Sequence, residues 1–214
     1  MNTRTLGADL TVSAVGLGCM GFSHAYGAPT EKKEAIRSIR AACDLGYTMF
    51  DTAETYGTAA DPHENEKLVG EALKDVRNSV QIVTKFGIRF DETSTAVNKP
   101  LIPDSRPETI RSSVEGSLRR LQTDHIDLYF QHRMDPRVEP EAVARVMADL
   151  IREGKITHWG ISEATEDYLR RAHAVCPVTA VQNRYSMMAR QHEALFPVLE
   201  ELKVGFVAFS PMAN

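Results

Sequence analysis

Two patterns of apolar residues alternate along this chain. Short, nearly continuous apolar runs, such as residues 80–84, are typical of parallel strands that are buried on both faces. Between these runs, apolar residues recur three and four positions apart, as at Ile110, Val114, Leu118 and Leu121, and this spacing predicts amphipathic helices. Because the two patterns alternate with short connections, we expect a fold of parallel βα units.

The alternation predicts about seven strands and six helices, in one domain that spans residues 1–214. The expected strands are residues 12–15, 47–50, 80–84, 126–130, 156–161, 178–181 and 204–209. The expected helices are residues 30–45, 64–74, 110–121, 139–153, 165–174 and 191–203. Two segments lie outside this alternation. Residues 1–14 suit a small hairpin, and residues 87–107 form a long polar segment of the kind that is usually functional or mobile.

Polar residues follow the expected strands at equivalent positions. They are Asp51, Lys85, His132, Ser162 and Gln182. In a (β/α)8 barrel of the TIM type, the carboxyl ends of the strands form the rim that carries the chemistry. Five strand ends that deliver polar groups to one rim therefore favour this α/β fold and place a candidate site there.

Composition excludes several classes of protein. The chain has 43% hydrophobic and 25% charged residues, as in globular proteins, and its net charge of -4 argues against a nucleic-acid-binding surface. Apolar runs of membrane-spanning length are absent from the sequence, and we see no secretion signal. Cys19, Cys43 and Cys176 are odd in number and far apart, which favours reduced thiols in a cytoplasmic protein without a metal site.

Residues 16–21 contain a Gly-x-Gly-x-x-Gly motif, which can mark a dinucleotide-binding turn. That motif requires a helix to open at its third glycine, so that the helix N-terminus faces the pyrophosphate. Gly27 and Pro29 follow instead, and the next helical pattern begins only at Thr30. The Rossmann interpretation is therefore disfavoured.

The rim residues suggest acid–base chemistry. Asp51 ends a buried run, where a carboxylate without a partner would be costly, and Tyr56 lies on the loop that follows. A phenol has a pKa of about 10 and protonates a substrate well at neutral pH only beside a cation. Lys85 could supply that cation, held by Asp51, and His132 could bind the substrate oxygen or relay a proton to Tyr56.

This set suits the reduction of a carbonyl to an alcohol, with a hydride from a nicotinamide cofactor. Ser162, Gln182 and Asn183 are suited to hydrogen bonds with a carboxamide, and Phe209 to stacking on its ring. Each residue alone also has a structural interpretation, because polar side chains at strand ends often satisfy loop backbone and an aromatic residue is often core. The functional interpretation is favoured because so many of them occupy equivalent positions.

Taken together, seven stretches resemble the aldo-keto reductase family, and they cover essentially the whole chain in the family's order. They are residues 16–21, 50–57, 65–73, 83–85, 127–132, 159–163 and 208–211. The resemblance implies a (β/α)8 barrel that uses NADPH to reduce small aldehydes and ketones.

The resemblance also implies roles for individual residues. It implies Asp51, Tyr56, Lys85 and His132 as the catalytic tetrad, with Tyr56 as the proton donor. It implies that the nicotinamide is contacted by residues at the ends of several strands. These are Asp51, Ser162, Gln182, Asn183, Phe209 and Ser210.

The sequence departs from the family at its end. Family members run on through a further helix, strand and helix, and they carry there the basic loop that grips the cofactor phosphates. We therefore expect an incomplete barrel with lower affinity for NADPH, since charge-assisted phosphate contacts contribute strongly. The first and last strands would be open edges that invite pairing with a second copy of the chain.

Two other functions stay open. A barrel with open edges could be catalytically impaired and act as an oligomerising or partner-binding protein. Lys85 at a strand end could also form a Schiff base, as in an aldolase, but such a lysine is normally desolvated or set near another cation. Asp51 would instead keep Lys85 charged, which disfavours the aldolase.

Overall fold

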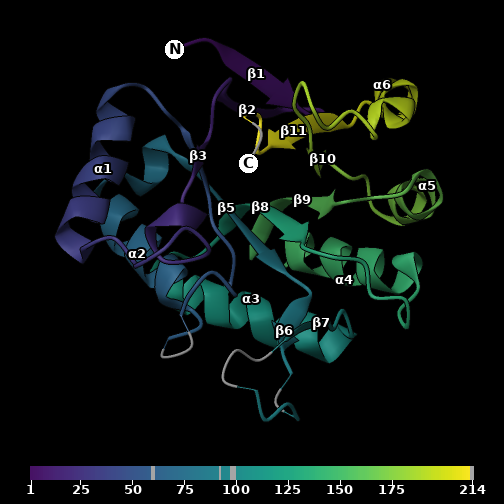
Figure 1. Cartoon of the computed structure of the whole chain (residues 1–214). Helices are drawn as coiled ribbons and strands as arrows, with labels where there is room; N and C mark the ends of the chain where they lie inside the picture. The colour runs from purple at the N-terminus through teal and green to yellow at the C-terminus, as the bar shows by residue number, and fades with distance from the viewer. Residues whose placement is uncertain (59–60, 92, 97–99, 213–214) are drawn as a thin grey trace.

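The computed structural model describes residues 1–58, 61–91, 93–96 and 100–212. Its centre is a seven-stranded sheet in the order β11-β10-β9-β8-β5-β4-β3, and all neighbouring pairs are parallel. The strands are β3 (Leu17–Gly18), β4 (Met49–Asp51), β5 (Gln81–Phe86), β8 (Ile126–Gln131), β9 (Ile156–Ser162), β10 (Ala180–Arg184) and β11 (Gly205–Phe209). The strands lie in the sheet in the same order as along the chain, and the sheet curls into part of a barrel, as the sequence predicted (Figure 1).

The six α-helices of the described residues lie on the outer side of the curled sheet (Figure 1). They are α1 (Lys32–Asp44), α2 (Glu64–Leu73), α3 (Pro107–Leu121), α4 (Pro140–Arg152), α5 (Glu166–Val175) and α6 (Phe196–Leu202). Three short 3-10 helices accompany them: η1 (Met20–Phe22), η2 (Lys74–Ser79) and η3 (Glu193–Leu195). The last expected helix, 191–203, is divided into η3 and α6, because Pro197 lacks an N–H and fits only the first turn of an α-helix.

The predicted bounds of the first barrel strand were wrong, and the long polar segment holds strands of its own. The apolar residues expected to form the first barrel strand, 12–15, instead begin within β2 (Leu10–Ser13), which pairs antiparallel with β1 (Thr3–Leu6) in the N-terminal hairpin. The polar segment at 87–107 holds an antiparallel ribbon of β6 (Ile88–Phe90) and β7 (Leu101–Pro103). Short apolar runs indicate strands, but they do not indicate which partner each strand will find.

The N-terminal hairpin closes one end of the barrel. Its Leu6, Leu10 and Val12 pack into an interior apolar cluster with side chains from β4, β5, β8 and β10. Gly7 lies against Thr179, and Leu6 lies against Gly205, so the hairpin covers the start of the last strands. The opposite end, where the strands finish, is left for a site.

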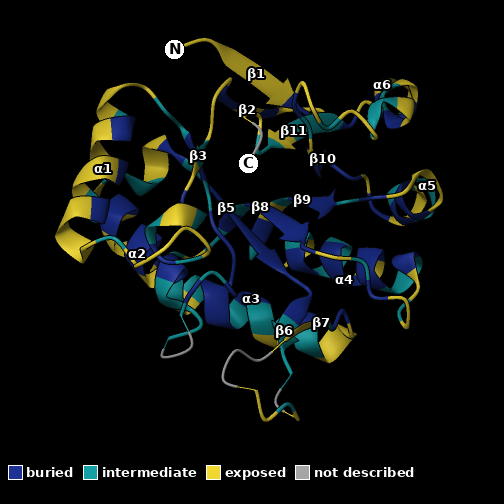
Figure 2. Cartoon of the chain, viewed as in Figure 1, coloured by how far each residue is buried: buried dark blue, intermediate teal, exposed yellow. Residues whose placement is uncertain are grey.

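A larger apolar layer lies between the sheet and the helices. Figure 2 shows the central strands β5, β8, β9 and β10 as mostly buried, whereas the outward faces of helices such as α1 and α5 carry exposed residues. Among the described residues, every helix is too short or too polar to cross a lipid bilayer.

Gly160 on β9 leaves the space that the interior packing needs. A Cβ added there would lie 2.3 Å from the Phe130 ring and 2.5 Å from the carbonyl oxygen of Ala180. We expect Gly160→Ala to lower the free energy of unfolding by about 1–3 kcal/mol, because the neighbours must shift. Urea unfolding measures this change. Gly18→Ala is the control, since a Cβ at Gly18 meets nothing within 4 Å, and equal losses in both variants would contradict the packing argument.

Candidate active site

A buried ion pair lies at the carboxyl end of the sheet. Lys85, near the end of β5, has a side chain that is 1% exposed, and its ammonium donates a hydrogen bond to Oδ1 of Asp51 at the end of β4. Lys85 Nζ also donates to the carbonyl oxygen of Thr52 at 2.7 Å. Burial alone would lower the pKa of Lys85, but Asp51 and then Tyr56 outweigh it, so this pKa is raised. Lys85 is therefore held as an ammonium, which disfavours the Schiff-base interpretation.

The Tyr56 phenol lies between this ammonium and a histidine. Lys85 Nζ is 4.9 Å from the centroid of the Tyr56 ring, and the Tyr56 hydroxyl is 3.5 Å from Nε2 of His132. Burial, followed by the nearby Lys85, Arg133 and His24, lowers the pKa of His132 well below its usual value. The imidazole is therefore uncharged at neutral pH, and its Nε2 can either donate a hydrogen bond to the phenol or accept one from it.

Asn65, the second residue of α2, holds the loop that carries Tyr56. Its buried amide accepts from Thr52 Oγ1 at 2.6 Å and donates to Ser23 Oγ at 2.6 Å and to the Cys19 carbonyl at 2.9 Å. Its backbone N–H donates to the Tyr56 carbonyl at 3.0 Å. Asn65 therefore joins the two loops that follow β3 and β4 beside the ion pair. Sequence reasoning gave Asn65 no role, because a polar residue in the first turn of a helix is usually solvated.

His24 is a second residue that sequence reasoning missed. It lies on the loop after β3, and its ring stacks on Tyr56 with centroids 5.8 Å apart and an angle of 19° between the planes. Its Nδ1–H donates to the carbonyl of Gly57 at 2.8 Å. The stacking limits where the Tyr56 ring can move.

The strand ends on the other side of Asp51 supply amide and hydroxyl groups. Gln182 on β10 donates from Nε2 to Oδ2 of Asp51 at 2.8 Å. Ser162, which ends β9, accepts a hydrogen bond from Nη1 of Arg133 at 3.3 Å. Phe209 ends β11 and is followed by Ser210.

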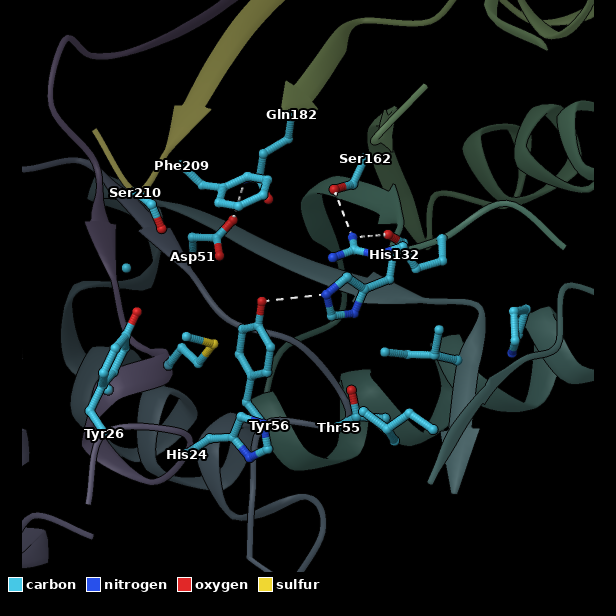
Figure 3. Close-up of a pocket in the computed structure, with 17 residues that line it drawn as sticks. His24, Tyr26, Asp51, Thr55, Tyr56, His132, Ser162, Gln182, Phe209 and Ser210 are labelled. Atoms are coloured by element: carbon cyan, nitrogen blue, oxygen red, sulfur yellow. Dashed lines mark hydrogen bonds between the residues drawn. The ribbon is translucent and has the colours of Figure 1, made fainter. Parts of the chain in front are cut away.

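These side chains surround a cavity of about 640 Å³ (Figure 3). The predicted residues that line it are Asp51, Tyr56, His132, Ser162, Gln182, Phe209 and Ser210. Lys85 lies behind the lining and reaches the site through its contacts with Asp51 and Tyr56. Asn183 does not line the cavity. Successive side chains of a strand face opposite sides, so Asn183 lies on the face of β10 opposite to Gln182. It is fully buried there, and its amide has no hydrogen-bond partner among the described residues.

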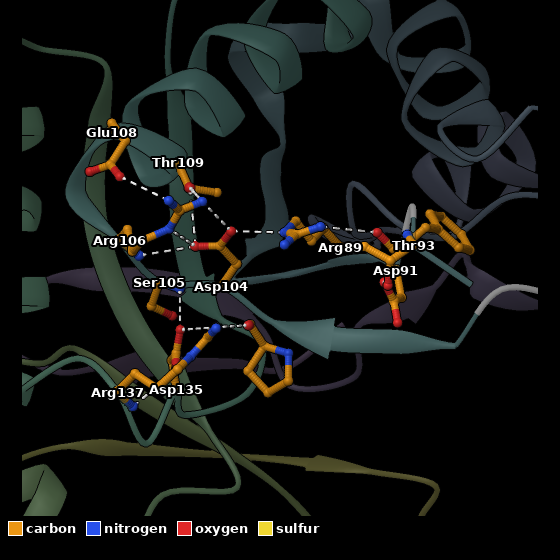
Figure 4. A network of polar contacts seen from close by, with 12 residues as sticks. Arg89, Asp91, Thr93, Asp104, Ser105, Arg106, Glu108, Thr109, Asp135 and Arg137 are labelled. Atoms are coloured by element: carbon orange, nitrogen blue, oxygen red, sulfur yellow. Dashed lines mark hydrogen bonds and ion pairs between the residues drawn. The ribbon is translucent and has the colours of Figure 1, made fainter.

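The ribbon of β6 and β7 supplies an apolar wall of the cavity through Ile88, Leu101 and Pro103. A buried carboxylate just beyond β7 anchors it (Figure 4). Asp104 accepts from Arg89 and from Arg106, each at 2.8 Å, and the pKa of Asp104 is lowered mainly by Arg106. The wall is thus tied to the N-terminus of α3.

A second buried acid lies on the same loop as Tyr56. Burial, followed by the charge of Glu66, raises the pKa of Glu54 from 4.5 to about 8. Glu66 is itself fully buried and is neutralised by Arg120 Nε, 2.6 Å from its Oε2. Glu54 is therefore largely protonated at neutral pH in the folded chain.

The raised pKa of Glu54 predicts a pH-dependent stability. The folded state keeps a proton that the unfolded state loses above pH 4.5, so this contribution is complete below that pH and disappears as the pH rises to about 8. We expect the free energy of unfolding to fall across this window, by at most about 1.4 kcal/mol per pH unit from this group. In Glu54→Gln that part of the slope should vanish. Urea unfolding from pH 5 to 8 measures it, with Glu200→Gln, on the exposed side of α6, as the control. Identical slopes in Glu54→Gln and the unaltered chain would contradict the assignment.

Comparisons with known proteins identify the family of the chain. The model of the Aldo/keto reductase family matches residues 14–214. Probable aldo-keto reductase 1 of Glycine max is 43% identical over 205 residues, which is 95% of this chain and 57% of that protein.

Two solved structures are similar over nearly all of the chain. An aldo-keto reductase from Bacillus halodurans in its holo form has a TM-score of 0.84 and 32% identity, with 97% of this chain and 65% of that one covered. A glycerol dehydrogenase from Gluconobacter oxydans has a TM-score of 0.82 and 30% identity, with 96% and 62% covered. The chain thus spans less than two thirds of the length of these three relatives. On the family match and the shared barrel, the chain belongs to the aldo/keto reductase family.

Proposed function

We propose that this chain carries the catalytic face of an NADPH-dependent oxidoreductase that reduces aldehydes and ketones to alcohols. The observation that carries the proposal is the buried Lys85 ammonium, paired with Asp51 and set against the Tyr56 phenol at the edge of a cavity. Family membership supports oxidoreductase chemistry, and the cavity is of a size that holds small molecules.

The chain's own groups account for the proton. Tyr56 would donate its hydroxyl proton to the carbonyl oxygen as that oxygen becomes an alcohol. The adjacent Lys85 ammonium would stabilise the phenolate that remains, and Asp51 keeps the ammonium in place. The neutral His132 imidazole, whose Nε2 is 3.5 Å from the Tyr56 hydroxyl, would donate a hydrogen bond to the substrate oxygen.

The residues of the cavity fit a nicotinamide. Ser162 and Gln182 offer a hydroxyl and an amide at neighbouring strand ends, and Phe209 offers a flat apolar face in the same cavity. When bound, the reduced nicotinamide would supply the hydride. Asp51, Ser162, Gln182, Phe209 and Ser210 would hold it, whereas Asn183, which is buried on the other face of β10, would act only through packing.

Three finer features stay predictions. The use of NADPH rather than NADH rests on the family resemblance, and titration of the chain with both nucleotides tests it. A cytoplasmic location rests on the unpaired cysteines, which remain free thiols in the structure. The apolar ribbon wall favours a small carbonyl substrate with an apolar substituent.

We expect Tyr56→Phe to lower kcat for a simple aldehyde by about 10²- to 10⁴-fold, because the proton donor is removed. NADPH-dependent aldehyde reduction measures kcat, and NADPH fluorescence shows whether the cofactor still binds. Tyr185→Phe is the matched control, since the Tyr185 hydroxyl donates to Glu193 and does not line the cavity. Unchanged turnover in Tyr56→Phe would refute the donor role.

The open sheet favours a second hypothesis, a partner-binding protein. β3 and β11 are both edge strands, and a groove of about 520 Å³ is lined by residues of β11 and of the segment that leads into β3. Edge strands with free backbone groups pair readily, so we expect concentration-dependent association of the purified chain. Light scattering over a range of concentrations measures it. A stable monomer that oxidises NADPH with an aldehyde would rule this hypothesis out.

A further inference from the structure

Arg133 is a cavity residue that the proposed function does not use. It follows His132 directly after β8, it is exposed, and it lines the same cavity as Ser162. Its Nη1 donates to the carbonyl oxygen of His132 at 2.6 Å and to Ser162 Oγ at 3.3 Å. Among the described residues, no carboxylate forms an ion pair with it, so its contacts point to a role other than a surface ion pair.

The contact with Arg133 fixes what Ser162 can do. A guanidinium has only donors, so Ser162 Oγ must be the acceptor of this bond. The hydroxyl hydrogen of Ser162 is then free to be donated to another group. Since Ser162 is only 1% exposed, that group must come from the cavity rather than from bulk water.

Gln182 presents a hydrogen-bond acceptor to the cavity, whereas Ser162 presents a donor. An ionised carboxylate only accepts, so Asp51 holds the Nε2 amide group of Gln182 as a donor and leaves Oε1 as the acceptor. Ser162 and Gln182 are direct neighbours in the register of β9 and β10. Side by side, they therefore present one donor and one acceptor, which is the complement of a primary carboxamide.

We propose that Arg133 is a positioning residue that sets Ser162 as a hydrogen-bond donor and thereby fixes the orientation of the cofactor carboxamide. The carboxamide oxygen faces Ser162, and its NH₂ group faces Gln182. This inference rests on the proposed function, because it takes the nicotinamide to be the ligand. Without Arg133, the Ser162 hydroxyl loses this donor and is free to turn away from the carboxamide.

A double-mutant cycle tests the proposal through cofactor binding alone. Arg133→Met keeps the long side chain and removes the donors, and NADPH fluorescence gives the dissociation constant. We expect affinity to fall roughly three- to tenfold, as for one hydrogen bond. In the Ser162→Ala background, Arg133→Met should cause no further loss, and Arg133→Lys should restore part of the affinity in the Ser162 background.

Arg145→Met, on the exposed face of α4, is the matched control and should bind NADPH like the unaltered chain. Circular dichroism confirms that each variant is folded. Equal losses from Arg133→Met with and without the Ser162 hydroxyl would overturn the inference, because Arg133 would then act independently, for example on a cofactor phosphate. Undiminished binding in Arg133→Met overturns this inference alone, whereas an unaltered chain that binds no NADPH overturns the proposed function as well.

Discussion

The structure depends on a charged amine buried at the mouth of the barrel. Removing a charge from water is costly, and the cost is met only if the charge is paired and fully hydrogen-bonded. Lys85 satisfies this requirement with the Asp51 carboxylate, the Thr52 carbonyl and the adjacent Tyr56 ring. Because these partners come from β4, β5 and the loop between β4 and α2, the same interaction holds the strands in register and assembles the candidate site.

Asp51 connects the two halves of that site. One carboxylate oxygen pairs with Lys85, on the side of the phenol, and the other accepts from Gln182, on the side of the strand ends that suit a nicotinamide. Gln182 is 131 residues away in the sequence, and curvature of the sheet brings it across the barrel mouth. A disturbance of Asp51 would therefore affect proton supply and cofactor orientation together.

A further layer of polar residues holds the loops from outside. Asn65 ties together the loops that carry Cys19, Thr52 and Tyr56, and Asp104 ties the apolar ribbon to α3. Such groups are stabilising only while every partner is present, because a buried polar group without a partner is costly. Rigid loops of this kind suit a site whose groups must stay a few ångströms apart.

Sequence alone was enough to predict the order of strands and helices, the barrel class, and the positions of Asp51, Lys85, His132, Ser162 and Gln182 at or near the carboxyl ends of strands. It could do so because hydrophobic periodicity is a local property and parallel strands share one rim. Tertiary contacts were needed to show that Arg133 and His24 face the cavity, that Asn183 turns away from it, and that burial keeps His132 neutral and Glu54 protonated. These features depend on the curvature of the sheet and on exclusion of water, which arise from contacts between residues far apart in the chain.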